Sequence, residues 1–124
     1  SYSGITMRKD VKVFHGKVRG RIWVETGKGA FLGVGRIELL IKIRESGSIS
    51  KAAKAMKMSY RQAWELIESM NQKSKKPLVI SKTGGKGGGG ATITEAGEKA
   101  IRDFSKLNLA FRKFLIRQSA IFNG

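Results

Sequence analysis

The segment that decides the fold lies at residues 48–64, SISKAAKAMKMSYRQAW. Ser48 predicts the cap of a short helix over 49–56, because a serine at this position accepts a hydrogen bond from a backbone N–H of the first turn. The inward face of that helix carries Ile49, Ala52, Ala53 and Met56. Its two alanines are small enough for a second helix to cross closely.

A second helix is predicted directly after a very short turn. Lys57 and Met58 leave room for a tight turn only. Ser59, with Gln62 three residues later, has the pattern of a capping box. The apolar positions that this helix turns inward are Ala63, Ile67 and Met70, with Leu66 partly covered. A short helix, a tight turn and a capped second helix predict a helix-turn-helix.

The chain on the N-terminal side of this motif predicts a hairpin and one more helix. Apolar and polar residues alternate over 17–25, which predicts a half-buried strand. Turn-forming residues follow at 26–29, and a short partner strand is expected at 30–32. The apolar spacing then changes to that of a helix over 35–46, and Gly47 is a natural stop for it.

On the C-terminal side, two β-prone runs flank a glycine-rich segment. The runs are 78–80 and 91–93, and six glycines lie within the eight residues 83–90. Two strands joined by such a tip predict a hairpin wing. Thr94 then predicts the cap of a long helix over 95–118.

The long helix carries an apolar stripe close to heptad spacing, which is more apolar surface than one small domain can cover. We therefore expect this helix to join two copies of the chain. The predicted dimer contacts are Leu39, Ile43, Ile101, Phe104, Leu107, Phe111 and Phe114.

Together these elements predict a mainly α fold with small β hairpins, namely a winged helix-turn-helix with a long C-terminal dimerisation helix. Three parts are expected along the chain. They are a basic, flexible N-terminal tail at 1–16, the winged helix-turn-helix domain at 17–94, and the dimerisation helix with the C-terminal tail at 95–124.

The charge of the chain points to a polyanionic partner. Its 25 lysines and arginines outnumber its 9 aspartates and glutamates by 16. No acidic residue lies between Glu68 and Glu95, where five lysines fall, and residues 48–61 are also basic without an acid. Clusters of this kind are typical of proteins that bind nucleic acid.

The residue types exclude several kinds of chemistry. Without cysteine there are no disulfides, thiolate zinc sites or cysteine nucleophiles, and the single histidine, His15, leaves little for metal or triad chemistry. The glycine-rich segment does not match a phosphate-binding loop, because Gly87 follows Lys86 where serine or threonine is needed. No apolar run is long enough to span a membrane. We expect no enzyme, no metal and no cofactor, and a location in the cytoplasm.

The second helix of the motif is the predicted reader of DNA sequence. A rotation of about 100° per residue places Arg61 on its outer face, and an arginine there can bond to O6 and N7 of guanine in the major groove. Serines at helix starts and lysines of the first helix suit phosphates, and a lysine at the wing tip suits a minor groove or phosphates nearby. The predicted DNA-binding residues are Ser48, Ser50, Lys51, Lys54, Ser59, Tyr60, Arg61, Gln62, Trp64 and Lys86.

Some of these residues have a purely structural alternative. Capping alone explains Ser48, and ordinary exposure to solvent would explain Arg61. Trp64 lies beside the inward face, so packing explains it as well as base contact does. Glu65 lies near the outer face, where its carboxylate repels phosphate and can accept a hydrogen bond from a cytosine amino group.

The motifs occur in the order of a known family. They are Gly20-Arg21-Ile22-Trp23, GRIELL at 35–40, GSISKAAK at 47–54, Ser59-Tyr60 with Ala63-Trp64, Met70-Asn71, Pro77-Leu78-Val79, TGGKGGGG at 83–90 and TEAG at 94–97. Over residues 17–115 the chain resembles the N-terminal DNA-binding domain of ModE-type molybdate-responsive regulators. That domain is related to the winged helix of LysR-type regulators.

The resemblance implies a homodimer joined through the long C-terminal helix and the N-terminal strand region. It also implies a palindromic operator near genes for oxyanion uptake or molybdoenzymes. Members of the family bind molybdate in C-terminal β-rich domains, which are not found up to Gly124. The resemblance therefore does not assign molybdate sensing to this chain.

Two other functions fit the sequence. A non-specific architectural protein would bind DNA by charge and shape alone, whereas regulators favour their site by roughly 10³-fold or more. A module that binds a membrane surface or a protein partner through its last helix would be a monomer that exposes Phe104, Phe111 and Phe114.

Overall fold

The structure, a computed structural model, describes residues 5–8, 11–82 and 90–123. The chain forms two compact units, which we call the core unit, Trp23–Ser105, and the terminal unit, Ser1–Ile22 with Lys106–Gly124. The long helix α4, Glu95–Ser119, begins in the core unit and ends in the terminal unit.

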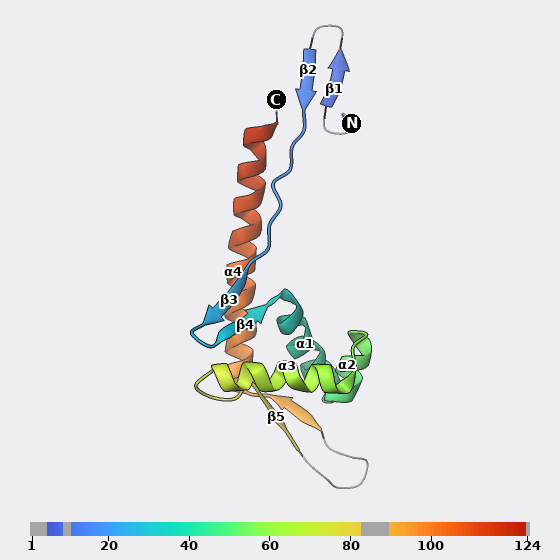
Figure 1. Cartoon of the computed structure of the whole chain (residues 1–124), viewed down its shortest axis with the longest axis vertical. Helices are drawn as coiled ribbons and strands as arrows, with labels where there is room; N and C mark the ends of the chain where they lie inside the picture. Colours follow the sequence, from blue (N-terminus) through green and yellow to red (C-terminus); the bar gives the residue numbers. More distant parts are fainter. Residues whose placement is uncertain (1–4, 9–10, 83–89, 124) are drawn as a thin grey trace. The chain divides into compact units, whose positions relative to one another are not determined.

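The core unit has the predicted winged helix-turn-helix fold, mainly α with small β hairpins (Figure 1). Its elements before α4 are β3 Trp23–Thr26, β4 Gly29–Gly33, α1 Val34–Ser46, α2 Ile49–Ala55, α3 Tyr60–Lys73, β5 Val79–Ser81 and β6 Ala91–Ile93. Helices α1 and α2 are within one residue of their predicted ranges at both ends, and α3 begins directly after the predicted cap, Ser59.

Helix α1 supplies the centre of the hydrophobic core. Leu39, Leu40 and Ile43 are 0% exposed. They lie on more than one side of the helix, as expected for a helix packed between two partners. The residues that the neighbouring helices bury are Ala52 and Ala53 of α2, Ala63, Ile67 and Met70 of α3, and Ala100, Ile101 and Phe104 of α4.

Gly47 ends α1 and also holds the wing. Its φ of 68° is in the left-handed region that favours glycine, and its N–H donates to the carbonyl of Ile43 over 2.7 Å. Its own carbonyl accepts a 2.9 Å hydrogen bond from the N–H of Ala91 in β6. The predicted stop is thus also a backbone link between the helical core and β6.

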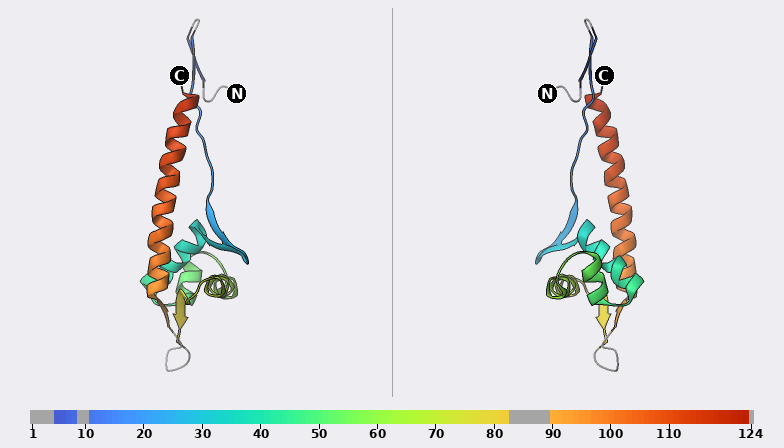
Figure 2. Two further views of the ribbon diagram at one scale, coloured as in Figure 1. Left: turned by 90° about the vertical axis from the view of Figure 1, so that its left-hand side faces the viewer. Right: turned by 90° about the vertical axis from the view of Figure 1, so that its right-hand side faces the viewer.

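The wing is an antiparallel hairpin of β5 and β6. Val79 pairs with Ile93, and Ser81 pairs with Ala91. In Figures 1 and 2 this hairpin projects from the helices of the core unit. The predicted tip, including Lys86, lies outside the described residues.

The predicted strand over 17–25 is wrong in its first part, because β3 begins only at Trp23. Strand β4 pairs its last residue, Gly33, with Trp23, so it has no residue left to pair with 17–22. The alternation has another cause in the terminal unit. There, Val18 is half-buried and its N–H donates to the Ser119 hydroxyl over 2.8 Å.

The terminal unit also contains a hairpin that the sequence analysis does not predict. Strands β1, Ile5–Arg8, and β2, Val11–Phe14, pair in antiparallel fashion. The last residues of the chain form the short 3-10 helix η1, Ala120–Phe122, and the N–H of Gly16 donates to the Phe122 carbonyl over 3.1 Å. No helix among the described residues combines the length and hydropathy needed to cross a membrane.

Candidate nucleic-acid interface

The helix-turn-helix is formed by α2, a tight turn and α3. The Ser48 hydroxyl accepts from the N–H of Lys51 over 3.1 Å, and the Ser59 hydroxyl accepts from the N–H of Gln62 over 3.0 Å. Both predicted serine caps are therefore confirmed. Between the helices Lys57 adopts a φ of 58°, a left-handed conformation that few residues other than glycine adopt.

The first turn of α3 presents large side chains to solvent. Tyr60 is 55% exposed, the Arg61 side chain is 87% exposed, and Gln62 is also exposed. The opposite side of α3 is buried at the three predicted positions, so this orientation is fixed by packing. An exposed, capped helix start with an arginine suits entry into a major groove.

Arg61 has an ionic partner one turn further along α3. Its Nε donates to Oε2 of Glu65 over 3.4 Å, and the Glu65 side chain is 60% exposed. Arg61 is thus exposed to solvent, as the structural alternative expects, and its guanidinium also has a carboxylate neighbour.

Trp64 takes part in packing and also faces solvent. It remains 44% exposed, yet it borders a cavity of about 60 Å³ with Ile49 of α2 and Val79 of β5. The two alternatives for Trp64 are thus compatible, because part of the residue is covered while the rest is exposed and can contact a ligand.

The outer side of α2 carries a row of cations beside the start of α3. Ser50, Lys51 and Lys54 are exposed, while Ser48 is half-buried by its capping position. Lys57 is exposed in the turn that follows. These groups could neutralise phosphates on either side of a groove that α3 enters.

Asn71, part of a family motif in the sequence, is a positioning residue whose role the sequence does not predict. Its Oδ1 accepts from the N–H of Leu78 over 2.8 Å and from that of Val79 over 3.3 Å, and its Nδ2 donates to the Val79 carbonyl over 3.0 Å. One side chain thus ties the end of α3 to the start of β5. An asparagine shortly before Pro77 was the available signal, since asparagine side chains often replace backbone partners in turns.

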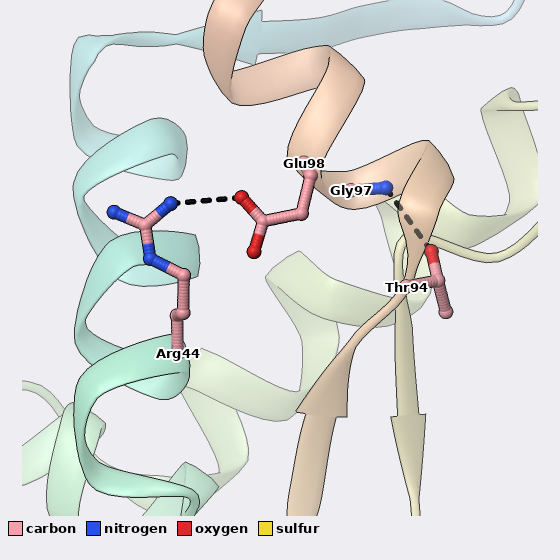
Figure 3. Close-up of polar contacts among 4 residues, drawn as sticks. All are labelled: Arg44, Thr94, Gly97 and Glu98. Atoms are coloured by element: carbon pink, nitrogen blue, oxygen red, sulfur yellow. Dashed lines mark hydrogen bonds and ion pairs between the residues drawn. The ribbon is translucent and has the colours of Figure 1, made fainter.

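The start of α4 is tied to the segment just before β5 and to α1; Figure 3 shows the cap at Thr94 and the link to α1. The Thr94 hydroxyl accepts from the N–H of Gly97 over 3.0 Å, which confirms the predicted cap, and it donates to the Pro77 carbonyl over 2.6 Å. Arg44 and Glu98 form an ion pair of 2.8 Å between α1 and α4. The chain at the start of β5 is therefore held by side chains from both α3 and the start of α4, and α4 is in turn paired with α1.

Four of the seven predicted dimer contacts lie in the core, and this part of the prediction is wrong. Leu39 and Ile43 are 0% exposed, Ile101 is 6% and Phe104 is 3% exposed. They cover other parts of their own chain, so no surface remains for a second copy. For the same reason Phe104 cannot serve as an exposed residue of a membrane-binding module.

The other three predicted dimer contacts lie in the α4 part of the terminal unit. Leu107 and Phe114 are exposed at 36% and 46%, and Phe111 is half-buried with its ring 6.4 Å from that of Phe114. Ile116, which the sequence analysis does not assign, is 71% exposed. We refer to Leu107, Phe111 and Phe114 as the α4 stripe.

The described residues contain no group of three or more histidines, aspartates and glutamates that could hold a metal ion.

Comparison with known proteins agrees with this geometry. The relatives include the molybdenum transport protein ModE of Azotobacter vinelandii, 36% identical over 83% of this chain and 38% of the relative. The DNA-binding transcriptional dual regulator ModE of Escherichia coli is 50% identical over 58% of this chain and 28% of the relative. The molybdenum-pterin-binding protein MopB of Rhodobacter capsulatus is 41% identical over 70% of the chain and 32% of the relative.

The chain therefore spans less than two fifths of the length of these relatives. The matching family model covers residues 34–98, from the start of α1 through the helix-turn-helix and the wing to the first turn of α4. Because that match takes in just over half of the 124 residues, the chain belongs to the bacterial regulatory helix-turn-helix proteins of the lysR family.

Proposed function

We propose that this chain is a sequence-specific DNA-binding module of a transcription regulator. The observation that carries the proposal is the capped start of α3, where Tyr60, Arg61 and Gln62 are exposed while the opposite face is buried. Helix-turn-helix proteins read base edges with these positions of their second helix. In this function Arg61 bonds to a guanine, and Tyr60, Gln62 and Trp64 contact bases or phosphates beside it.

The remaining predicted contacts position the protein on the backbone of DNA. Ser50, Lys51 and Lys54 face phosphates from α2, while the hydroxyls of Ser48 and Ser59 lie at helix starts where phosphates bind. Lys86, in the glycine-rich segment of the sequence, is proposed to contact a minor groove or phosphates next to the site. These contacts carry no sequence information and make the affinity depend on salt.

The regulator acts as a homodimer on a palindromic operator in the cytoplasm. Support for the dimer comes from Leu107 and Phe114 of the α4 stripe, since exposed apolar side chains on one face of a helix mark association surfaces. A two-fold symmetric dimer places two copies of α3 on two half-sites, so the operator is an inverted repeat. The relatives named for molybdenum transport and for ModE suggest genes of molybdate uptake or use as its targets.

The test is the selection of bound sequences from a random duplex pool at physiological salt. Enrichment of an inverted repeat supports a dimeric regulator, and the repeat spacing gives the distance between the two α3 helices. Retention of the pool without enrichment contradicts sequence-specific binding. No retention at all contradicts DNA binding.

A second candidate function is that of an architectural DNA-binding protein, favoured by the net charge of +16. It predicts nearly equal affinity for all duplexes. The ratio of affinities for the enriched and for random DNA separates the two, because regulators reach a ratio of roughly 10³ or more.

A further inference from the structure

We propose that Glu65 is a specificity-determining residue that positions Arg61 for guanine and lowers the affinity for other DNA. The proposal rests on the proposed function, namely DNA binding through α3. It assigns a role to a carboxylate on a helix face where negative charge opposes the approach of phosphates.

The geometry leaves the outer edge of the guanidinium available. Nε of Arg61 donates to Oε2 of Glu65 over 3.4 Å, and the two residues are one helical turn apart on the exposed face of α3. A guanidinium has five N–H groups in a fixed planar fork, and four of them belong to the two terminal nitrogens. A guanine can therefore take two donors at O6 and N7 while Nε keeps its carboxylate.

The pair also reduces the conformational entropy that the Arg61 side chain loses on binding. A long side chain that is 87% exposed samples many rotamers, and fixing one of them on DNA opposes binding. A carboxylate one turn away favours the rotamers that extend along the outer face of α3. In water such an exposed pair is weak, but DNA that covers α3 removes water and strengthens it.

Glu65 acts on non-specific DNA in the opposite direction. Its side chain is 60% exposed on the outer face of α3, where its charge repels phosphates that are not balanced by a correct base contact. The same residue thus strengthens binding to the guanine site and weakens binding elsewhere. Both effects raise the ratio of specific to non-specific affinity.

The experiment compares wild type, Glu65→Ala, Glu65→Gln, Arg61→Ala and the double variant R61A/E65A. A sequence is first enriched with wild type from the random pool, and the guanine whose preference Arg61→Ala removes is identified by single-base replacement. Glu38→Gln is the matched control, because Glu38 is an exposed glutamate on α1 rather than on α3. Circular dichroism and melting curves confirm that each variant is folded.

We expect Glu65→Ala to lower the preference for that guanine by roughly fivefold, a fraction of the full discrimination of an arginine–guanine pair. It also binds random duplexes more tightly. Glu65→Gln keeps part of the preference, since its amide oxygen still accepts from Nε, and Glu65→Ala changes nothing further at that base when Arg61 is absent. Glu38→Gln leaves the preference unchanged.

Three results overturn the proposal. If Glu65→Ala keeps the guanine preference, Glu65 does not position Arg61, and if it increases the preference, Glu65 competes with DNA for Arg61. If its loss falls on a cytosine and persists without Arg61, Glu65 reads a base itself. If Arg61→Ala leaves every base preference intact, there is no arginine contact to position. Failure of wild type to enrich any sequence is a different result, because it overturns the proposed function itself.

Discussion

Gly97 in the first turn of α4 lies directly against the backbone carbonyl of Leu78, at the start of the wing. A Cβ at Gly97 would overlap that oxygen and come within 2.6 Å of Cγ2 of Ile93. The absence of a side chain thus lets α4 approach both wing strands, where the Thr94 N–H also donates to Leu78 over 3.0 Å.

We expect Gly97→Ala to destabilise the protein by about 2–3 kcal/mol, because backbone atoms cannot give way as a flexible side chain can. Gly35→Ala is the matched control: Gly35 is also helical, and a Cβ there would meet nothing within 4 Å. The control should stabilise by up to about 1 kcal/mol, since alanine favours helix. Urea unfolding measures both free energies. Equal effects would contradict the close approach at Gly97.

Asn71 provides a second, polar link to the wing. Asn71→Ala removes the partners of two backbone N–H groups in a partly buried place, and we expect a loss of about 1–3 kcal/mol in the free energy of unfolding. Hydrogen exchange at Leu78 and Val79 should accelerate. The neighbouring exposed Gln72→Ala should change neither quantity, so a similar effect of Gln72→Ala would show that helix α3 and not the hydrogen bonds is responsible.

These links show where sequence reasoning reaches its limit. The helices of the core unit and the serine caps are predictable because capping residues, glycine and apolar spacing act within one or two turns. The contact of Gly97 with Leu78 and the bonds of Asn71 are not, because they join residues whose proximity follows only from the packed fold. The sequence predicts the two wing strands from their β-prone residues, but it does not predict the contacts that hold these strands against the helices.

The errors have the same physical origin. The alternation over 17–25 indicates that one side of this segment is partly buried, but it does not show whether a neighbouring strand or another surface buries it. Likewise, the apolar residues of α4 follow one another at a similar spacing along the whole helix. Its first part, with Ile101 and Phe104, packs in the core unit, whereas Leu107 and Phe114 remain exposed.

Ser59 allows the helix cap and the DNA contact to be separated. Ser59→Ala should cost about 1 kcal/mol of stability through the lost cap to Gln62. Ser59→Asp keeps the cap and the stability, but its negative charge on the proposed DNA-facing side should weaken binding to all duplexes. Ser59→Asn is the neutral control, which should keep both the helix cap and the DNA affinity. Unchanged DNA affinity in Ser59→Asp would place this helix start away from phosphates.

Substitution of Arg61 and substitution of Lys54 should affect DNA binding in different ways. Arg61→Ala should lower discrimination at one base by about 1–3 kcal/mol, because it removes a base contact. Lys54→Ala should weaken specific and random duplexes alike and reduce the slope of log K against log salt by about 0.9, because it removes a phosphate contact. Fluorescence anisotropy at several salt concentrations measures both. An equal loss of specific and random binding in Arg61→Ala would contradict base readout by Arg61.

The α4 stripe can be tested by its geometry on the helix. Leu107 and Phe114 are seven residues apart and therefore share a face, whereas Ile116 lies about 200° around the helix from Phe114. We expect Phe114→Ser to shift the chain from dimer to monomer in sedimentation velocity, because it removes an apolar group that is 46% exposed in the single chain. Ile116→Ser removes a more exposed apolar group, at 71%, and should leave the dimer intact.

A monomeric wild type would contradict the proposed homodimer, while dissociation by Ile116→Ser alone would move the interface to the other side of α4. Since two linked modules bind a palindrome more tightly than one, Phe114→Ser should also lose affinity for the inverted repeat but keep that for a single half-site.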